Sequence, residues 1–191
     1  MERRADEHGF PIVGRAVGRL LELAARAVGA RRVVELGSGF GYSAYWFARA
    51  VGPDGEVVAT DADPANAADA EGYLTRAGLW DRVRYEVGDA LEALSREPGE
   101  LDVVYCDVDK DGYPDAWAAA RDRIRVGGLW ICDNTLWDGR VVPDLEVPSN
   151  PRRDELAGPI AAHNRTVASD PDFVTSLLPV RDGVLVALRV R

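Results

Sequence analysis

The sequence predicts an α/β fold in which helices cover both faces of a doubly wound, mostly parallel sheet. Short apolar runs alternate with amphipathic stretches from residue 10 onward, as strands and helices do in such folds. Polar and acidic residues follow most of the apolar runs, as expected where parallel strands end at a ligand-binding edge. At 191 residues the chain can bury a substantial core, and we expect a single domain over residues 1–191.

The first predicted elements are a helix, a strand, a second helix and a second strand. Residues 11–28 place their apolar side chains on one stripe, which indicates an amphipathic helix. VVEL at 33–36 reads as a buried strand. A GSGFG turn then leads to a helix over 43–51, and GPDG precedes a second strand, EVVAT at 56–60.

Two further helices alternate with two further strands, and the capping residues mark their boundaries. Residues 64–77 form a helix that a proline opens and a glycine ends. VRYEV at 83–87 is the third strand, and Asp89 can cap the helix that follows it. LDVVYCD at 101–107 is the fourth strand, and residues 114–124 are expected to be helical.

The last part of the chain is predicted to complete the sheet after a long loop. GGLWICD at 127–133 is the fifth strand. Residues 134–154 are rich in proline and polar residues and are expected to form the loop, with a helix over 154–168 after it. Two strands, 173–178 and 184–190, are separated by a DG turn and are predicted to form an antiparallel hairpin.

The composition restricts the partners and the location of the protein. A formal net charge of −9 disfavours a nonspecific electrostatic grip on nucleic acid. No apolar stretch is long enough to span a membrane and no N-terminal signal pattern is present, so we expect a cytoplasmic protein with no membrane partner. Cys106 and Cys132 lie in apolar runs just before an aspartate, which suits buried, reduced thiols better than a disulfide.

A glycine-rich turn and a later aspartate point to a nucleoside cofactor. Gly37, Gly39 and Gly41 form a G-x-G-x-G turn, which lets a backbone approach a ligand closely and presents free N–H groups. Asp61 ends the second strand, where a carboxylate can accept hydrogen bonds from both ribose hydroxyls. The turn differs from the G-x-G-x-x-G of dinucleotide sites. A plain tight turn is the alternative, and the two features together favour the cofactor.

A second group of polar residues suggests a metal site. If the strands over 101–107 and 127–133 are neighbours, Asp107, Asp133 and Asn134 converge and offer two carboxylates and an amide oxygen. Such hard oxygen donors suit Mg²⁺ or a similar cation and disfavour zinc. The alternative is that Asp133 and Asn134 only cap a turn, which would leave two strand-end acids side by side without compensation.

Lys110 is the only lysine in a chain with 22 arginines. A lysine amine can lose its proton when burial or a neighbouring cation lowers its pKa, whereas arginine stays protonated in proteins. Lys110 is therefore a candidate general base. The alternative is a solvated lysine in a loop.

Several motifs occur together in an order typical of one enzyme family. They are ELGSGFGYS, ATDADP, GDA, YCDVDKDGY, CDNTLWDG and late HN and DG elements. They resemble the cation-dependent, S-adenosylmethionine-dependent O-methyltransferases, which include catechol and caffeoyl-CoA O-methyltransferases. The resemblance covers about residues 10–190, and D-x-x-K with D-N at successive strand ends is its most specific part. It implies a Rossmann-like sheet of seven strands, mostly parallel, with the last strand antiparallel.

The resemblance also implies roles for individual residues. Residues expected to bind the cofactor are Glu35, Gly37, Ser38, Gly39, Gly41, Tyr42, Ser43, Asp61, Ala62, Asp89, Ala90 and Asp107. Among them, Tyr42 and Ser43 would lie near the methionine moiety, Asp61 at the ribose and Asp89 at the adenine. The metal ligands would be Asp107, Asp133 and Asn134. The catalytic residues would be Lys110, as general base, and Asp107.

The implied reaction is methyl transfer to a small phenolic acceptor of the catechol type. Two vicinal hydroxyls would chelate Mg²⁺ or another divalent cation, which lowers their pKa and aligns one oxygen with the sulfonium methyl. Lys110 would accept the phenolic proton. Trp46 and Trp137 are either aromatic walls of the acceptor pocket or ordinary packing residues, and His163 is expected to be a packing residue. The resemblance leaves a homodimer open.

Three alternatives remain at this stage. An NAD-dependent oxidoreductase would share a similar sheet, but it predicts a G-x-G-x-x-G turn and a Tyr-x-x-x-Lys relay, which this sequence lacks. A non-catalytic S-adenosylmethionine-binding protein would have lost the chemistry, against which the intact metal and base positions argue. A nucleic-acid methyltransferase is disfavoured by the acidic balance and by the absence of an Asn/Asp-Pro-Pro-aromatic motif.

Overall fold

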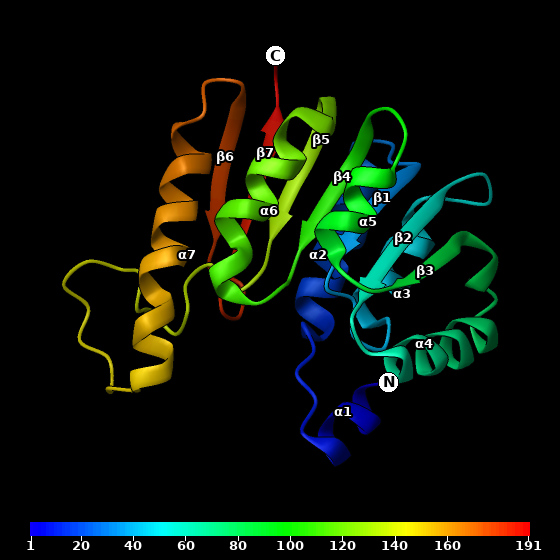
Figure 1. The fold of residues 1–191 in the computed structure, drawn as a ribbon, viewed down its shortest axis with the longest axis horizontal. Helices are drawn as coiled ribbons and strands as arrows, with labels where there is room; N and C mark the ends of the chain where they lie inside the picture. Colours follow the sequence, from blue (N-terminus) through cyan, green and yellow to red (C-terminus); the bar gives the residue numbers. More distant parts are fainter.

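A seven-stranded sheet forms the centre of the molecule in the computed structural model, which describes all 191 residues (Figure 1). The strand order is β3-β2-β1-β4-β5-β7-β6. The strands are β1 (Arg32–Leu36), β2 (Glu56–Asp61), β3 (Val83–Val87), β4 (Leu101–Cys106), β5 (Ile124–Cys132), β6 (Phe173–Leu178) and β7 (Val184–Arg189). The order reverses between β1 and β4, so a doubly wound sheet has its ligand-binding crevice beside these two strands.

The strand directions confirm the predicted topology. Strands β1 to β5 pair in parallel, and β7 is antiparallel to both β5 and β6. The predicted hairpin of the last two strands is therefore correct. The predicted adjacency of the fourth and fifth strands is also correct, because Cys106 and Cys132 are register partners in β4 and β5.

Helices cover both faces of the sheet, as predicted. They are α1 (Glu2–His8), α2 (Gly14–Ala27), α3 (Tyr42–Ala50), α4 (Pro64–Arg76), α5 (Ala90–Arg96), α6 (Tyr113–Ala120) and α7 (Pro151–Ser169), with short 3₁₀ turns η1 (Trp80–Arg82), η2 (Lys110–Gly112) and η3 (Arg121–Arg123). One apolar core joins α2, α3 and α4 to the sheet, and a second joins α5, α6 and α7 to the other face. Figure 1 shows the second set in front. None of the helices combines the length and apolar character that a membrane span requires.

Three elements differ from their predicted limits. Helix α1 was not predicted, because its seven residues are mostly charged and show no apolar stripe. Strand β5 starts at Ile124 and includes two glycines, with an irregular register against β4 near Leu101. Helix α7 begins at Pro151, where the Asn150 side chain accepts a hydrogen bond from the Arg153 N–H and caps the helix. The loop before α7 is correspondingly shorter than predicted.

Three predictions about packing residues are also resolved by the structure. Cys106 and Cys132 are buried and unpaired, as expected. His163 is buried and its Nε2 accepts a hydrogen bond from Trp130 Nε1 at 3.2 Å, so it is a packing residue. Trp46 is buried where α3 crosses α2, against Gly18, and does not line the cavity described below. Its role is packing.

Candidate active site

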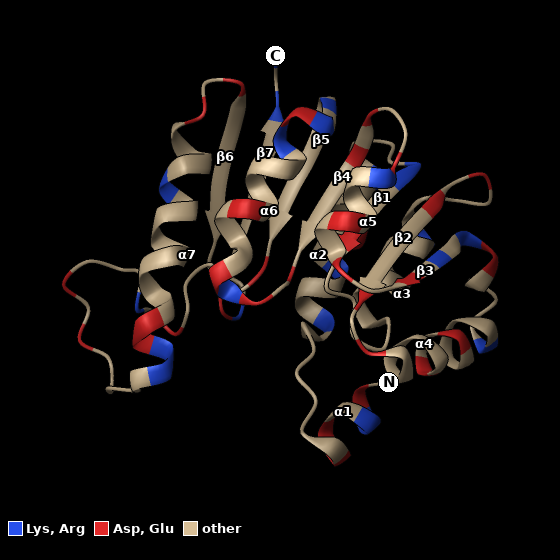
Figure 2. Ribbon diagram, in the orientation of Figure 1, with Lys and Arg blue, Asp and Glu red and all other residues tan.

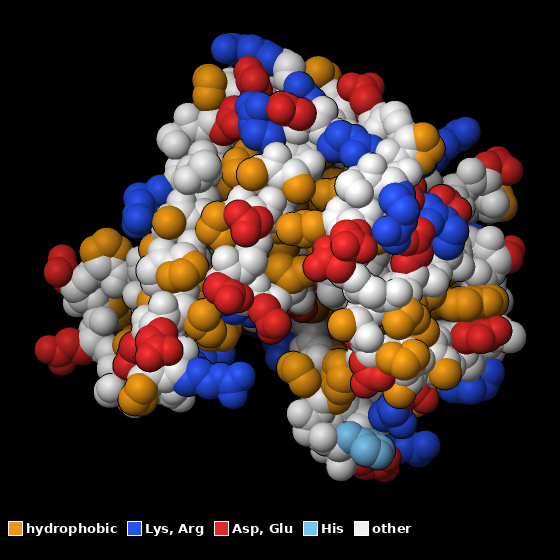
Figure 3. All heavy atoms as spheres, viewed as in Figure 1, with side chains coloured by type: hydrophobic (Ala, Val, Ile, Leu, Met, Phe, Trp, Pro, Cys, Tyr) orange, Lys and Arg blue, Asp and Glu red, His pale blue; other side chains and the backbone are white.

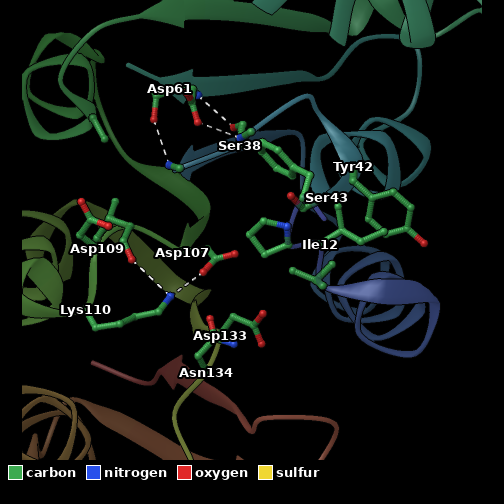
Figure 4. A pocket seen from close by; sticks show the side chains of 18 of the residues that line it. Ile12, Ser38, Tyr42, Ser43, Asp61, Asp107, Asp109, Lys110, Asp133 and Asn134 are labelled. Carbon is green, nitrogen blue, oxygen red and sulfur yellow. Dashed lines mark hydrogen bonds and ion pairs between the residues drawn. The ribbon is translucent and has the colours of Figure 1, made fainter. Parts of the chain in front are cut away.

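A large cavity lies at the carboxyl ends of the parallel strands, where the fold predicts a ligand (Figure 4). Its volume is about 1040 Å³. It extends from the glycine turn after β1 to the residues that follow β4 and β5. A hollow between α1 and the first turn of α7 is visible in Figure 3. A second cavity of about 570 Å³ adjoins it and shares Lys110 and Trp137.

The glycine turn forms one side of the main cavity. Gly37 has a φ of 85°, and a Cβ at this position would lie 2.5 Å from the Asp107 carbonyl oxygen, so only glycine fits. The turn is tied to the end of β2, because the Gly39 N–H donates to Asp61 Oδ2 at 3.0 Å. The close approach of this backbone to β4 brings the predicted cofactor turn and the predicted catalytic residues to the same cavity.

Glu35 lies beneath the turn and does not line the cavity. Its Oε2 accepts a hydrogen bond from Ser38 Oγ at 2.8 Å, and Oε1 has no partner. Burial raises the pKa of Glu35 to about 7, against the opposing effect of the neighbouring hydroxyl groups of Ser43 and Ser38. Glu35 therefore meets the cavity only through these serines, both of which line it.

Asp61 and Asp89, which were predicted to lie at the ribose and the adenine of the cofactor, are both at the cavity. Asp61 accepts hydrogen bonds from Gly39 N, Asp63 N and Asn66 Nδ2, which fix its carboxylate in place. Asp89 caps α5 by accepting from the N–H groups of its second and third following residues, both at 2.8 Å. The other predicted cofactor residues that line the cavity are Gly37, Ser38, Gly39, Tyr42, Ser43, Ala62, Ala90 and Asp107; Gly41 caps α3 behind it.

Asp107, Asp133 and Asn134 follow β4 and β5 and lie together on the opposite side of the cavity, as Figure 4 shows. Asp133 is only 4% exposed, and burial followed by the charge of Asp107 raises its pKa to about 7. Burial also raises the pKa of Asp107, which the Lys110 charge opposes. Two neighbouring carboxylates, one buried and one partly buried, would be stabilised by a bound cation.

The donor set at this point is two carboxylates and one amide. Nowhere does the chain bring three or more histidine, cysteine, aspartate or glutamate side chains into a metal-binding group. A cation held by these residues would thus need other oxygen ligands to complete its shell. This agrees with the chemistry of Mg²⁺, which commonly keeps only one or two protein carboxylates and binds water or substrate oxygens besides.

Lys110 points into the same cavity from η2. Its Nζ donates to Asp107 Oδ1 at 2.8 Å and to the Val108 carbonyl at 3.3 Å, and lies 5.0 Å from the centre of the Tyr113 ring. The side chain is only 13% exposed. The interpretation of Lys110 as a solvated loop lysine is therefore wrong.

Part of the cavity wall comes from an N-terminal segment that the sequence did not identify. Phe10 packs edge-on against Phe40 of the glycine turn, at 4.9 Å between ring centres. Helix α1 is held over the cavity by an ion pair between Arg4 and Asp69, and by the Tyr42 hydroxyl, which donates to Glu2 at 2.7 Å. These contacts join residues that share no motif, so no sequence signal could have located them.

The loop between β5 and α7 forms the opposite wall. Trp137 is 8% exposed and lines both cavities; its Nε1 donates to the Arg153 carbonyl at 2.7 Å, and the Arg153 guanidinium lies 4.1 Å from the ring centre. Arg140 fixes the loop from within: its side chain is 7% exposed and donates to Asp154 Oδ1 at 2.9 Å and Asp138 Oδ2 at 3.2 Å. Of the two predicted aromatic walls, Trp137 alone is at the cavity.

The fold and the cavity together define an S-adenosylmethionine-dependent methyltransferase. The sheet order with an antiparallel β7, a glycine turn after β1 and an acid ending β2 are the features of that class. Residues 7–190 match the model of the O-methyltransferase family. The chain belongs to this family and is an S-adenosylmethionine-dependent O-methyltransferase.

Curated relatives and solved structures agree with this assignment. Caffeoyl-CoA O-methyltransferase 2 of Petunia hybrida is 30% identical over 179 residues, covering 91% of this chain and 74% of the relative. The O-methyltransferase TomG of Streptomyces achromogenes, involved in tomaymycin synthesis and solved with S-adenosylmethionine, has a TM-score of 0.84 at 28% identity, covering 98% and 86% of the two chains. An O-methyltransferase from Bacillus cereus, solved with S-adenosylhomocysteine, has the same TM-score and identity and covers 98% and 88%.

Proposed function

We propose that the protein methylates one hydroxyl of a catechol-like small molecule and that it uses a divalent cation such as Mg²⁺. One observation carries this proposal: Lys110, Asp107 and Asp133 converge in the cavity whose other side is the glycine turn. This arrangement brings a base and a set of hard oxygen ligands next to the binding place of a methyl donor. The whole chain would act as one catalytic domain.

The residues on the two sides of the cavity would have separate tasks. The glycine turn with Ser38, Ser43, Asp61 and Asp89 would hold S-adenosylmethionine, and Asp107, Asp133 and Asn134 would hold the cation. When bound there, the cation would supply a Lewis acid that lowers the pKa of two vicinal hydroxyls. The protein's own residues would bind the methyl donor and take up the proton of the acceptor.

Lys110 would take the proton that the acceptor loses. Its Nζ, held by the Asp107 carboxylate, would first accept the phenolic proton, and the resulting phenolate oxygen then forms a bond to the methyl carbon. The carbon–sulfur bond breaks in the same step and S-adenosylhomocysteine leaves as a neutral sulfide. Because this step neutralises opposite charges, shielding of the cavity from water by α1 and Trp137 would favour it.

The test is an assay of S-adenosylhomocysteine release across a panel of acceptors. The panel contains catechols, a matched monophenol, and caffeoyl-CoA, for which the plant relatives are named. We expect turnover with catechols in Mg²⁺ and its loss in chelator. Undiminished transfer after exhaustive metal removal would contradict the cation assignment, and equal turnover of the monophenol would contradict the catechol assignment.

The family match and the surface charges also bear on the alternative functions, on a nucleic-acid partner and on the location of the enzyme. Family membership removes the support for an NAD-dependent oxidoreductase, and turnover in the assay would exclude a non-catalytic binding protein. Basic and acidic side chains are mixed along the chain and on the face that Figures 2 and 3 show, which supports the absence of a nucleic-acid partner. A cytoplasmic location remains part of the proposal.

The proposal of a homodimer has little support from the first long helix. Among the large apolar residues of α2, only Leu23 is strongly exposed, at 65%. An apolar stripe that could pack against a second copy is therefore absent from this helix. Sedimentation analysis of the purified protein would determine the oligomeric state.

A further inference from the structure

The backbone after β5 has an unusual conformation at the position of a proposed metal ligand. Asn134 has a φ of 51°, in the left-handed region that residues other than glycine seldom occupy. Such a conformation persists only where the surroundings hold it. The residues on both sides of Asn134 are indeed held by hydrogen bonds from distant parts of the chain.

The backbone before Asn134 is fixed at Asp133. The Asp133 N–H donates to the Cys106 carbonyl at 3.1 Å, which continues the pairing of β5 with β4. Its carbonyl accepts a hydrogen bond from the buried Tyr113 hydroxyl at 2.8 Å. Both backbone groups of this ligand are therefore satisfied within the core.

The backbone after Asn134 is fixed at Thr135 and Leu136. Their N–H groups donate to the carbonyls of Gly183 at 3.1 Å and Asp182 at 2.8 Å, which are the DG element of the β6–β7 turn. The Thr135 carbonyl accepts a hydrogen bond from Asn164 Nδ2 of α7 at 2.8 Å. Thr135 is itself fully buried. Asn164 is thus the side chain that anchors the downstream neighbour of Asn134.

The orientation of the Asn164 amide is set by a chain of hydrogen bonds. Trp130 Nε1 donates to His163 Nε2 at 3.2 Å, so the proton of the neutral imidazole is on Nδ1. Burial lowers the pKa of His163 to about 4, which keeps the ring neutral near pH 7. Its Nδ1 lies 3.2 Å from Asn164 Oδ1 and donates to it, which leaves the Asn164 NH₂ group for Thr135.

We propose that Asn164 is a positioning residue that acts through Thr135 to hold Asn134 and Asp133 in the geometry that binds the cation. This inference rests on the proposed function. The inference assigns a role to the HN element of the sequence, in which His163 orients the Asn164 amide. The DG element provides the matching backbone acceptors from the other side.

The test measures Mn²⁺ affinity by calorimetry in the absence of acceptor. Asn164→Asp has nearly the same shape but loses the NH₂ donor, and Asn164→Ser shortens the side chain so that it cannot reach Thr135. Residues that orient metal ligands typically change metal affinity by about 10–100-fold, and we expect a loss in this range for both variants. S-adenosylmethionine affinity, measured in the same way, should stay at the wild-type value.

A matched control is a hydrogen bond between β6 and the same helix. Thr175 Oγ1 of β6 donates to the Val167 carbonyl of α7 at 3.3 Å, and neither residue lines a cavity, so Thr175→Val removes a similar bond and should keep wild-type Mn²⁺ affinity. Wild-type Mn²⁺ affinity in a folded Asn164 variant, or an equal loss in Thr175→Val, would overturn the positioning role. Absence of Mn²⁺ binding by the wild-type protein would instead overturn the cation assignment in the proposed function.

Discussion

On the side of the cavity proposed for the cofactor, Asp61 and Asp89 are held largely by residues close to them in sequence. On the side proposed for the acceptor, called the acceptor side below, Asp133 and Trp137 are held from distant elements. Asp61 is fixed largely by Asp63 and Asn66, and Asp89 by the first turn of its own helix. By contrast, the Asp133 backbone carbonyl accepts a hydrogen bond from Tyr113, and the Trp137 ring nitrogen donates to the Arg153 carbonyl. A local arrangement survives changes elsewhere in the fold, while a distributed one depends on how several elements pack together.

The strongest test of the acceptor side is Lys110→Arg. The variant keeps a positive charge beside Asp107 but cannot give up a proton, so we expect S-adenosylhomocysteine release to fall by about 10²–10⁴-fold. Affinity for S-adenosylmethionine, which depends on the other side, should be unchanged by calorimetry. Near-normal turnover would show that Lys110 is not the general base.

The cofactor side is tested by Gly37→Ala, with Gly78→Ala as its control. Both glycines have positive φ values, +85° and +66°, but a Cβ at Gly78 meets nothing within 4 Å. Backbone strain alone should lower the free energy of unfolding by about 1 kcal/mol at Gly78. The added overlap with the Asp107 carbonyl should raise the loss to about 3 kcal/mol at Gly37.

Urea unfolding measures both glycine variants, and calorimetry measures their S-adenosylmethionine affinity. The affinity should fall only in Gly37→Ala. Equal losses of stability in the two variants would mean that the close approach of the turn to β4 is less tight than the structure indicates.

The smallest expected effect concerns the loop that carries Trp137. Arg140→Ala removes the ion pairs with Asp138 and Asp154, whose side chains are 46% and 42% exposed. We expect the KM for the acceptor to rise by up to about tenfold, because the loop that carries Trp137 is held less firmly. The KM for S-adenosylmethionine should not change.

Arg121→Ala is the matched control for Arg140→Ala. Arg121 is bound by Asp170 and Asp172 beyond the other end of α7, away from both cavities. Its replacement should leave both KM values as they are. A rise of the acceptor KM in both variants would indicate a general loosening of α7 and not a specific role of the loop.

The same contrast explains how much could be predicted from the sequence. The seven strands were predictable because each is an apolar run bounded by turn residues, and Asp107 and Asp133 were predictable because they end neighbouring strands. Helix α1 was not predictable from the sequence, since contacts with the distant residues Asp69 and Tyr42 hold it in place. The positioning role proposed for Asn164 was not predictable either, because Thr135 lies 29 positions away and no sequence pattern joins the two residues.

The left-handed backbone at Asn134 limits which amino acids this position can accept. Asparagine, aspartate and glycine are the residues that most readily take up such a conformation. Of these three, glycine has no side-chain oxygen for a cation, and aspartate would add a third carboxylate beside Asp107 and Asp133, whose pKa values are already raised. Backbone geometry and charge balance therefore both favour asparagine at this position, and few substitutions would satisfy both.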